Sequence, residues 1–145
     1  MNKKEVDISL VSRQFEDPDD LNDFEQTEVL TQGTLEETEN GFIVEYEETE
    51  ASGFEGCVTT IELAGKDKVI MSRRGNAASN MIIQAGEKHY CIYGTLYGNF
   101  EVGITAREIH DLSDDKVKKL AFSYVVDVNS SLIGLFDLQL EVKMR

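Results

Sequence analysis

Turn-forming residues recur along this chain at short and regular intervals. Glycine, asparagine or serine clusters stand about 8 to 12 residues apart over most of the chain, at 40–41, 53–56, 65–67, 75–76, 86–87, 98–99 and 129–130. The segments between them are short for helices and match the usual length of β-strands. The spacing therefore predicts an antiparallel meander.

Apolar and polar residues alternate between these turns. Val6, Ile8 and Leu10 alternate with polar neighbours, and the same period of two runs through 120–128 and 136–144. Nine or ten such strands, each with one apolar face, are satisfied by a closed barrel or a sandwich, and closure also removes exposed strand edges. We therefore expect an all-β fold, an antiparallel meander β-barrel.

One segment departs from the pattern. In TAREIHDLSDDKVKK, Thr105 and Glu108 have the spacing of a helix capping box, while Ile109 and Leu112 are three residues apart. This predicts a short helix or an irregular crossover, and at most one helix in the fold. No linker or internal repeat divides the sequence, so we expect residues 1–145 to form a single domain.

Charge excludes some partners. The net charge is -14, and the 52 residues between Arg13 and Lys66 hold sixteen acidic residues with no lysine or arginine. Phosphate backbones and anionic membranes bind to clustered cations, so we expect neither nucleic acid nor membrane as a partner. The aromatic and glycine-rich stretch YGTLYGNFEVGIT, although it resembles an RNA-stacking strand, is better explained as a hairpin that turns at Gly98-Asn99.

The sequence also indicates where the protein is located and whether its cysteines are reduced. The start of the chain has no apolar run typical of a signal peptide, and no stretch of 18 apolar residues occurs. Cys57 and Cys91 lie 34 residues apart, which favours two reduced, packed thiols over a disulfide framework. We expect a cytoplasmic protein.

Residues with catalytic or metal-binding chemistry form no recognised constellation. His89 and Cys91 share a strand face and, with Cys57, could supply three zinc ligands, but the spacing matches no zinc motif. Glu45, Glu47 and Glu48 could pair for acid–base work, but such runs usually face solvent. We therefore expect no catalytic residues, no metal site, no cofactor and no enzymatic activity.

Arg73 is the most informative polar residue. In VIMSRRG it shares a strand face with Val69 and Met71, so it points into the barrel if they do. An inward guanidinium could hold a ligand carboxylate through two parallel hydrogen bonds. The alternative is an arginine at the barrel mouth that pairs with one of the many glutamates or extends to water.

Ordered spacings across the chain carry a family resemblance. They lie in TQGTLEETENGFIVEYEE, in VIMSRRGNAASNMIIQAGEKHYCIYGTLYGNFEVGIT, in LAFSYVVDV and in LQLEVK. With these segments the sequence resembles the YwiB-like family of bacterial proteins. The resemblance implies a lipocalin-like barrel of the calycin group, and it implies no reaction.

Two functions are compatible with such a barrel. The first is a non-catalytic module that binds a small apolar or amphipathic anionic ligand, with Arg73, Met71, Val69 and Tyr93 as candidate ligand-binding residues. The second is a protein-interaction or scaffold domain whose barrel is filled by its own side chains. Interior volume distinguishes the two, since an eight-stranded barrel can be filled or can hold one small ligand.

Overall fold

Ten antiparallel strands make up the computed structural model, which describes residues 3–50, 53–75, 78–95 and 98–145. In chain order they are β1 (Lys3–Phe15), β2 (Glu25–Glu37), β3 (Gly41–Glu47), β4 (Val58–Ala64), β5 (Lys68–Arg74), β6 (Ser79–Gln84), β7 (Lys88–Thr95), β8 (Gly98–Asp111), β9 (Val117–Val128) and β10 (Ser131–Met144). They form one sheet in the order β6-β5-β4-β3-β2-β1-β10-β9-β8-β7. The predicted all-β antiparallel meander is confirmed.

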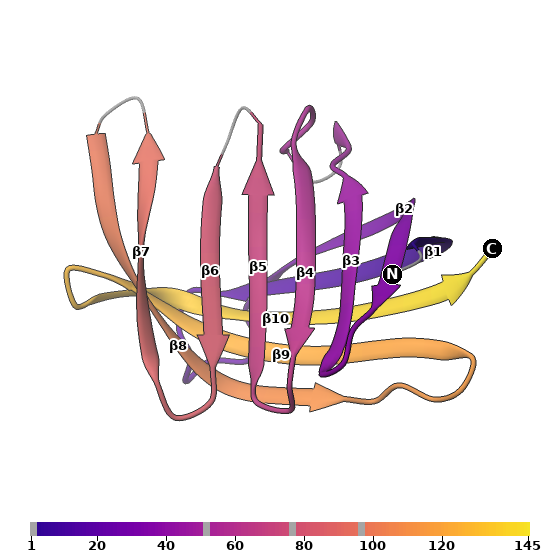
Figure 1. Ribbon diagram of the computed structural model, residues 1–145. Coiled ribbons are helices and arrows are strands. Elements are labelled where there is room, and N and C mark those ends of the chain that lie inside the picture. The colour runs from indigo at the N-terminus through magenta and orange to yellow at the C-terminus, as the bar shows by residue number, and fades with distance from the viewer. Residues whose placement is uncertain (1–2, 51–52, 76–77, 96–97) are drawn as a thin grey trace.

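The sheet folds into two layers because β2 changes partner at Gly33. Residues 25–36 pair with β1, but only Gly33–Glu37 pairs with β3. A Cβ atom at this position would collide with the carbonyl oxygen of Glu45, so the close approach requires glycine. In Figure 1, β3 to β6 cross steeply in front of β1, β10 and β9.

The apolar faces of the two layers meet in one core. Phe42 from the first layer and Phe122 from the second are both at most 2% exposed. The buried cluster comprises Val6, Ile8, Leu10, Val29, Leu35, Phe42, Val44, Tyr46, Ile61, Leu63, Val69, Ile83, Ile104, Leu120, Phe122, Tyr124, Leu138, Leu140 and Val142. These side chains occupy the interior, and they lie on the faces that the alternation predicts.

The barrel is nearly closed. The two edge strands of the sheet, β6 and β7, follow each other in the chain and meet where one turn joins them. Among the described residues they are linked by a single bridge between Gln84 and Glu87. The expectation of a barrel is confirmed, with this weakly paired junction as its seam.

The helix expected after Thr105 is wrong. β8 continues through this segment to Asp111, which pairs with Leu120 of β9. The ladder shifts register between Ala106 and Glu108, so Arg107 is the extra residue of a β-bulge. Pairing with β9 overrides the local capping signal, because a capping box adds only about 1 kcal/mol to a helix of one turn.

Two hairpins show how far turn residues predict turns. Val128 and Ser131 are paired, and the two residues between them, Asn129 and Ser130, both have positive φ angles of 52° and 67°. In the second hairpin, Gly98 and Asn99 are strand residues of β8 that pair with Thr95 and Gly94, so the turn expected at Gly98-Asn99 is wrong. Residues 96 and 97 lie outside the described residues.

Candidate functional site

Three neighbouring strands place polar side chains on one row at one end of the barrel. This end, where β3 and β5 finish and β4 and β6 begin, is drawn uppermost in Figure 1 and is called the upper end here. Tyr46 of β3 lies opposite Thr59 of β4, and Thr59 lies opposite Arg73 of β5. All three share the inner faces of their strands with core residues, so the row closes the interior at the upper end.

Arg73 has three neighbours in this row and above it. Its Nε donates a long hydrogen bond of 3.4 Å to Oγ1 of Thr59. Its guanidinium carbon lies 3.7 Å from the centre of the Phe54 ring, which comes from the connection between β3 and β4. Its Nη2 is 4.0 Å from Oε2 of Glu48, and the Arg73 side chain remains 20% exposed. These contacts fix the plane of the guanidinium.

Glu48 is the unusual member of the cluster. Its side chain is only 2% exposed, and its Oε1 has no hydrogen-bond partner among the described residues. Its backbone N–H donates to the carbonyl oxygen of Cys57 at 2.8 Å, which holds the residue at the end of β3. Buried polar atoms nearly always have partners, so this oxygen requires an explanation.

The charges of the cluster shift the pKa values of two buried tyrosines. Burial, followed by the neighbouring negative charge of Glu48, raises the pKa of the Tyr46 phenol above its usual range, while Arg73 and Thr59 act in the opposite direction. Burial also raises the pKa of Tyr124, and the positive charge of Arg73 opposes that rise. Both phenols are therefore protonated at neutral pH, and a hydrogen bond from the Tyr46 phenol to the Glu48 carboxylate also contributes to the raised pKa of Tyr46.

The neighbouring Arg74 belongs to the outer face. Its Nη1 lies 3.5 Å from Oε2 of Glu45, and the same carboxylate oxygen accepts a hydrogen bond from Thr60 at 3.3 Å. The Arg74 side chain is 65% exposed. This pair is a surface interaction and contributes little to stability.

The residues predicted for the site are placed as follows. Val69, Met71 and Arg73 share the inner face of β5, but Val69 is 0% exposed and Met71 is partly buried against the core. Tyr93 is on β7, where its backbone pairs with Phe100, and its side chain lies outside the described part of the structure. Arg73 lies near Glu48, which agrees with the alternative in which this arginine pairs with a glutamate at the barrel mouth.

Thr59 and Phe54 are site residues that the sequence did not single out, and Glu48 was considered only as part of an acidic run. Glu48 was expected to face solvent with Glu45 and Glu47, and for Glu48 that expectation is wrong. It lies two residues beyond Tyr46, so the alternation of β3 places it on the inner face. Extending the period past the last apolar residue would have found it.

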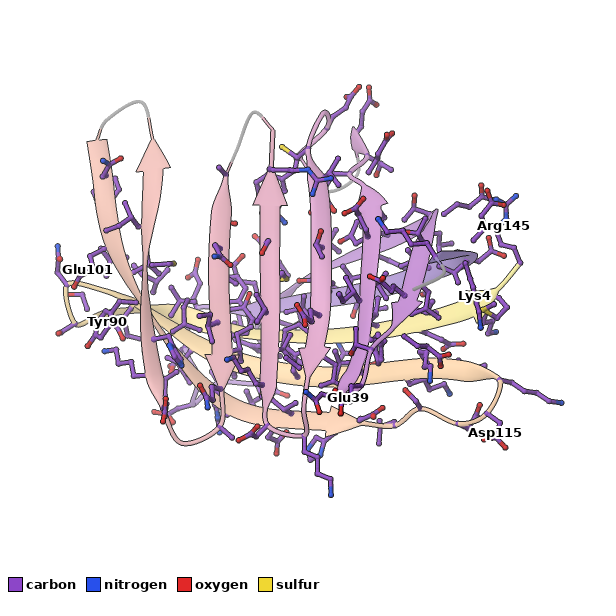
Figure 2. All side chains as sticks on the ribbon, viewed as in Figure 1. Lys4, Glu39, Tyr90, Glu101, Asp115 and Arg145 are labelled. Carbon is purple, nitrogen blue, oxygen red and sulfur yellow. The ribbon has the colours of Figure 1, made fainter. Side chains whose placement is uncertain are left out.

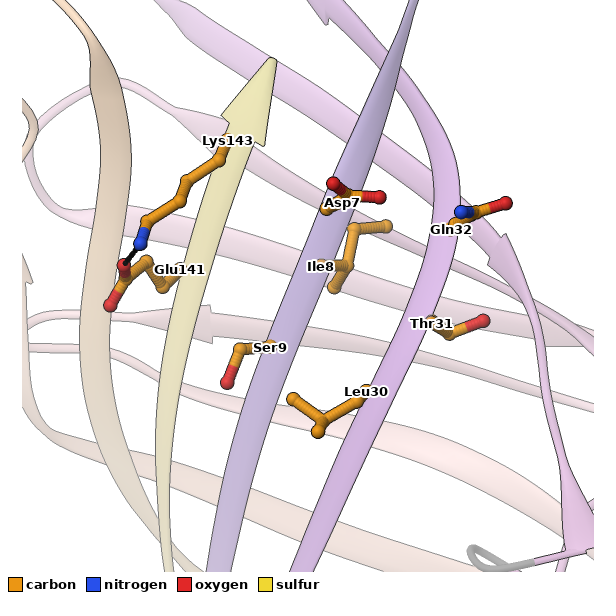
Figure 3. Close-up of a pocket in the computed structure, with 8 residues that line it drawn as sticks. All are labelled: Asp7, Ile8, Ser9, Leu30, Thr31, Gln32, Glu141 and Lys143. Carbon is orange, nitrogen blue, oxygen red and sulfur yellow. Dashed lines mark ion pairs between the residues drawn. The ribbon is translucent and has the colours of Figure 1, made fainter. Parts of the chain in front are cut away.

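A shallow hollow lies on the outside of the barrel, away from this cluster (Figure 3). It crosses β2, β1 and β10, and at its border Glu141 and Lys143 form an ion pair of 3.2 Å. Leu30 projects there and is 71% exposed. This hollow contains no buried oxygen or nitrogen that lacks a partner among the described residues, so it is a weaker candidate than the cluster at the upper end.

Metal-ligating and thiol residues are dispersed. Within the described ranges, no three histidine, cysteine, aspartate or glutamate side chains are grouped to hold a metal ion. Nε2 of His89 is 2.9 Å from Oε1 of Gln84, and neither Cys57 nor Cys91 forms a disulfide among the described residues. A helix able to cross a membrane does not occur in the described part of the chain.

The fold and the site together define a ten-stranded antiparallel β-barrel with an arginine–glutamate pair at one end. Residues 8–140 match the family described as a domain of unknown function (DUF1934), and the chain belongs to that family. The crystal structure of the ywiB protein from Bacillus subtilis has a similar fold, with a TM-score of 0.80 at 16% sequence identity, covering 99% of this chain and 93% of that one. No curated protein matches the sequence. The YwiB-like resemblance is thus confirmed.

Proposed function

We propose that the protein is a non-catalytic binding module that takes a small ligand at the upper end of its barrel. The observation that carries the proposal is the buried carboxylate of Glu48, whose Oε1 has no partner among the described residues. Leaving such an oxygen unpaired is destabilising by about 1–3 kcal/mol or more, because the group has lost its water. A ligand that donates a hydrogen bond to Oε1 relieves this penalty.

The ligand chemistry follows from the two groups that the cluster leaves incomplete. Glu48 requires a donor, whereas Arg73 has five N–H donors, of which Thr59 and Glu48 engage only some. A primary or secondary amide carries an acceptor next to a donor and matches both groups. A carboxylate would place a second negative charge beside Glu48 in a chain of net charge -14. For this reason we propose an amide in place of the anionic head group that Arg73 alone suggested.

The apolar part of such a ligand has limited room. Val69 is fully buried in the core and offers it no surface, whereas Phe54 and Met71 are partly exposed on either side of Arg73 along the site. We therefore expect a short apolar group that contacts Phe54, not a long tail inside the barrel.

The filled interior supports a second candidate, the protein-interaction domain. The buried cluster spans both layers, so much of the barrel is occupied by its own side chains. The two candidates differ in where a partner binds. A small ligand depends on Glu48, whereas a protein partner uses the outer surface.

Titration with matched small molecules tests the ligand proposal. We expect hexanamide to shift the backbone amide NMR signals of Thr59 and Arg73 saturably, and hexanoate to bind at least about fivefold more weakly because of repulsion by Glu48. Glu48→Gln should reduce this preference, since its amide carries no charge. Glu47→Gln is the matched control, because that carboxylate is exposed on the outer face of the same strand.

The opposite results have clear meanings. If neither compound produces a saturable shift up to its solubility limit, only water donates a hydrogen bond to Oε1 of Glu48, and the small-ligand proposal is wrong. If Glu47→Gln changes the preference as much as Glu48→Gln, the effect is general surface charge and the cluster is not the site.

A further inference from the structure

One half of β2 has a strand on only one side. Residues 25–36 pair with β1, but pairing with β3 is confined to Gly33–Glu37. The remaining segment, Glu25–Gln32, is named the β2 edge here. No backbone hydrogen bond outside the strand ladders involves the β2 edge within the described part of the chain.

An edge of this kind carries unused hydrogen-bonding groups. In an antiparallel strand, alternate residues direct both their N–H and their C=O to the same neighbour. About half of the residues in the β2 edge therefore direct these groups away from β1, where no strand follows. Such an edge is a template for one further strand.

The open side of the β2 edge borders an acidic hollow at the upper end. The hollow is lined by residues 30–34 of β2, by residues 45–49 at the end of β3, and by Val58 and Arg74. Its carboxylates are those of Glu45, Glu47 and Glu48, and its single cation among the lining residues, Arg74, is already paired with Glu45. The hollow is therefore a region of negative potential.

The β2 edge itself is also acidic and has one exposed apolar position. Glu25 and Glu28 are exposed, and Leu30, two residues beyond Glu28 on the same outer face, is 71% exposed. The sequence supplies no lysine or arginine between Arg13 and Lys66, so neither β2 nor β3 neutralises this charge. A strand added here would lie between the carboxylates of β2 and those of the hollow at the end of β3.

We propose that the β2 edge binds an extended, basic segment of another protein, which adds to the barrel as an antiparallel strand, the orientation of the ladders already in the sheet. Backbone hydrogen bonds to the β2 edge supply affinity, and side chains supply selection. A lysine or arginine beside Glu28 and an apolar residue two positions away, beside Leu30, match the outer face. A second copy of this chain does not match, because pairing two β2 edges would bring Glu25 and Glu28 of both copies together.

The residues that carry this site, Glu28 and Leu30 of β2, take no part in the Arg73 cluster, although the hollow beside the β2 edge shares Glu48 with the proposed small-ligand site. The test uses a nine-residue peptide in which lysine and leucine alternate with threonine. We expect binding by calorimetry, weakened as salt rises, and slower hydrogen exchange for amides within residues 25–32. Glu28→Lys should weaken binding at least about tenfold. Glu39→Lys changes the net charge equally at the β2–β3 turn, on the far side of the barrel from the upper end (Figure 2), and should have little effect.

The decisive control is the same peptide with alternate backbone nitrogens methylated. Methylation keeps every charge but removes the N–H donors along one edge of the peptide strand. One version is methylated on odd positions and the other on even positions. Only one of them can form the ladder with the β2 edge while its lysine and leucine side chains lie on the outer face, so the two versions must differ in affinity. Equal binding by both versions, or no change of exchange in residues 25–32, would reduce the interaction to surface charge and overturn the proposal. Sedimentation of the free protein as a dimer in which the amides of residues 25–32 are already protected from exchange would also overturn it, because a second copy would then occupy the edge.

Discussion

Replacing Arg73 by methionine tests whether the Arg73–Glu48 pair stabilises the barrel. Methionine keeps an unbranched chain but removes the guanidinium, and with it the 4.0 Å approach to Glu48, the contact with the Phe54 ring and the 3.4 Å bond to Thr59. Glu48 then remains buried with no cation beside it. We expect the variant to be less stable.

The size of the effect follows from the geometry. Two unit charges 4.0 Å apart attract by about 4 kcal/mol at an effective dielectric constant near 20. Solvent screening of the partly exposed guanidinium and the desolvation of both groups leave roughly 1–2 kcal/mol for the pair. The ring contact adds about 0.5–1 kcal/mol, and the better burial of methionine offsets about 1 kcal/mol. The free energy of unfolding should therefore fall by roughly 0.5–2 kcal/mol.

A double-mutant cycle measured by urea unfolding at neutral pH isolates the pair. Glu48→Gln removes the charge that Arg73→Met leaves uncompensated, so the double variant should lose less stability than the two single variants together. We expect a coupling energy of about 1 kcal/mol. A coupling energy below about 0.3 kcal/mol would refute the reasoning, because the two charges would then be independent.

Two further predictions concern backbone conformation and use the same unfolding measurement. Ser130→Gly should raise the free energy of unfolding by about 0.5–1 kcal/mol, because Ser130 has a φ of 67° in a turn for which Asn-Gly is the preferred pair; an unchanged or lower value would contradict this. Gly98→Val should lower it by more than about 1 kcal/mol, because Gly98 has a φ of 123° that a β-branched residue rarely adopts; a variant as stable as the parent would show that the hairpin relaxes without strain.

The strands could be predicted from sequence because each carries its own signal. Phe42, Val44 and Tyr46 alternate within one short segment, and all three are buried in the core. The helix signal at Thr105 and Glu108 was equally local, but long-range pairing of β8 with β9 overrides it. Local patterns therefore predict elements well only where tertiary pairing agrees with them.

The site could be predicted only in part. The direction of Arg73 follows from the period of β5, but its partner does not, since Glu48 lies on another strand and comes near through the registers of β3, β4 and β5. Phe54 belongs to a connection whose path has no periodic signal. The free β2 edge depends on the bend at Gly33, and a glycine in a strand shows that a bend is permitted without giving its direction.

The strand order also bears on how quickly this barrel can fold. Every ladder except one joins strands that follow each other in the chain, and the exception pairs β1 with β10, where Val6 lies opposite Met144. Closing a loop of that length costs roughly 2 kcal/mol more entropy than closing a ten-residue hairpin, at about 0.6 kcal/mol for each doubling. Two meanders, β1 to β6 and β7 to β10, can therefore assemble from local contacts, while the β1–β10 ladder raises the contact order, which slows folding.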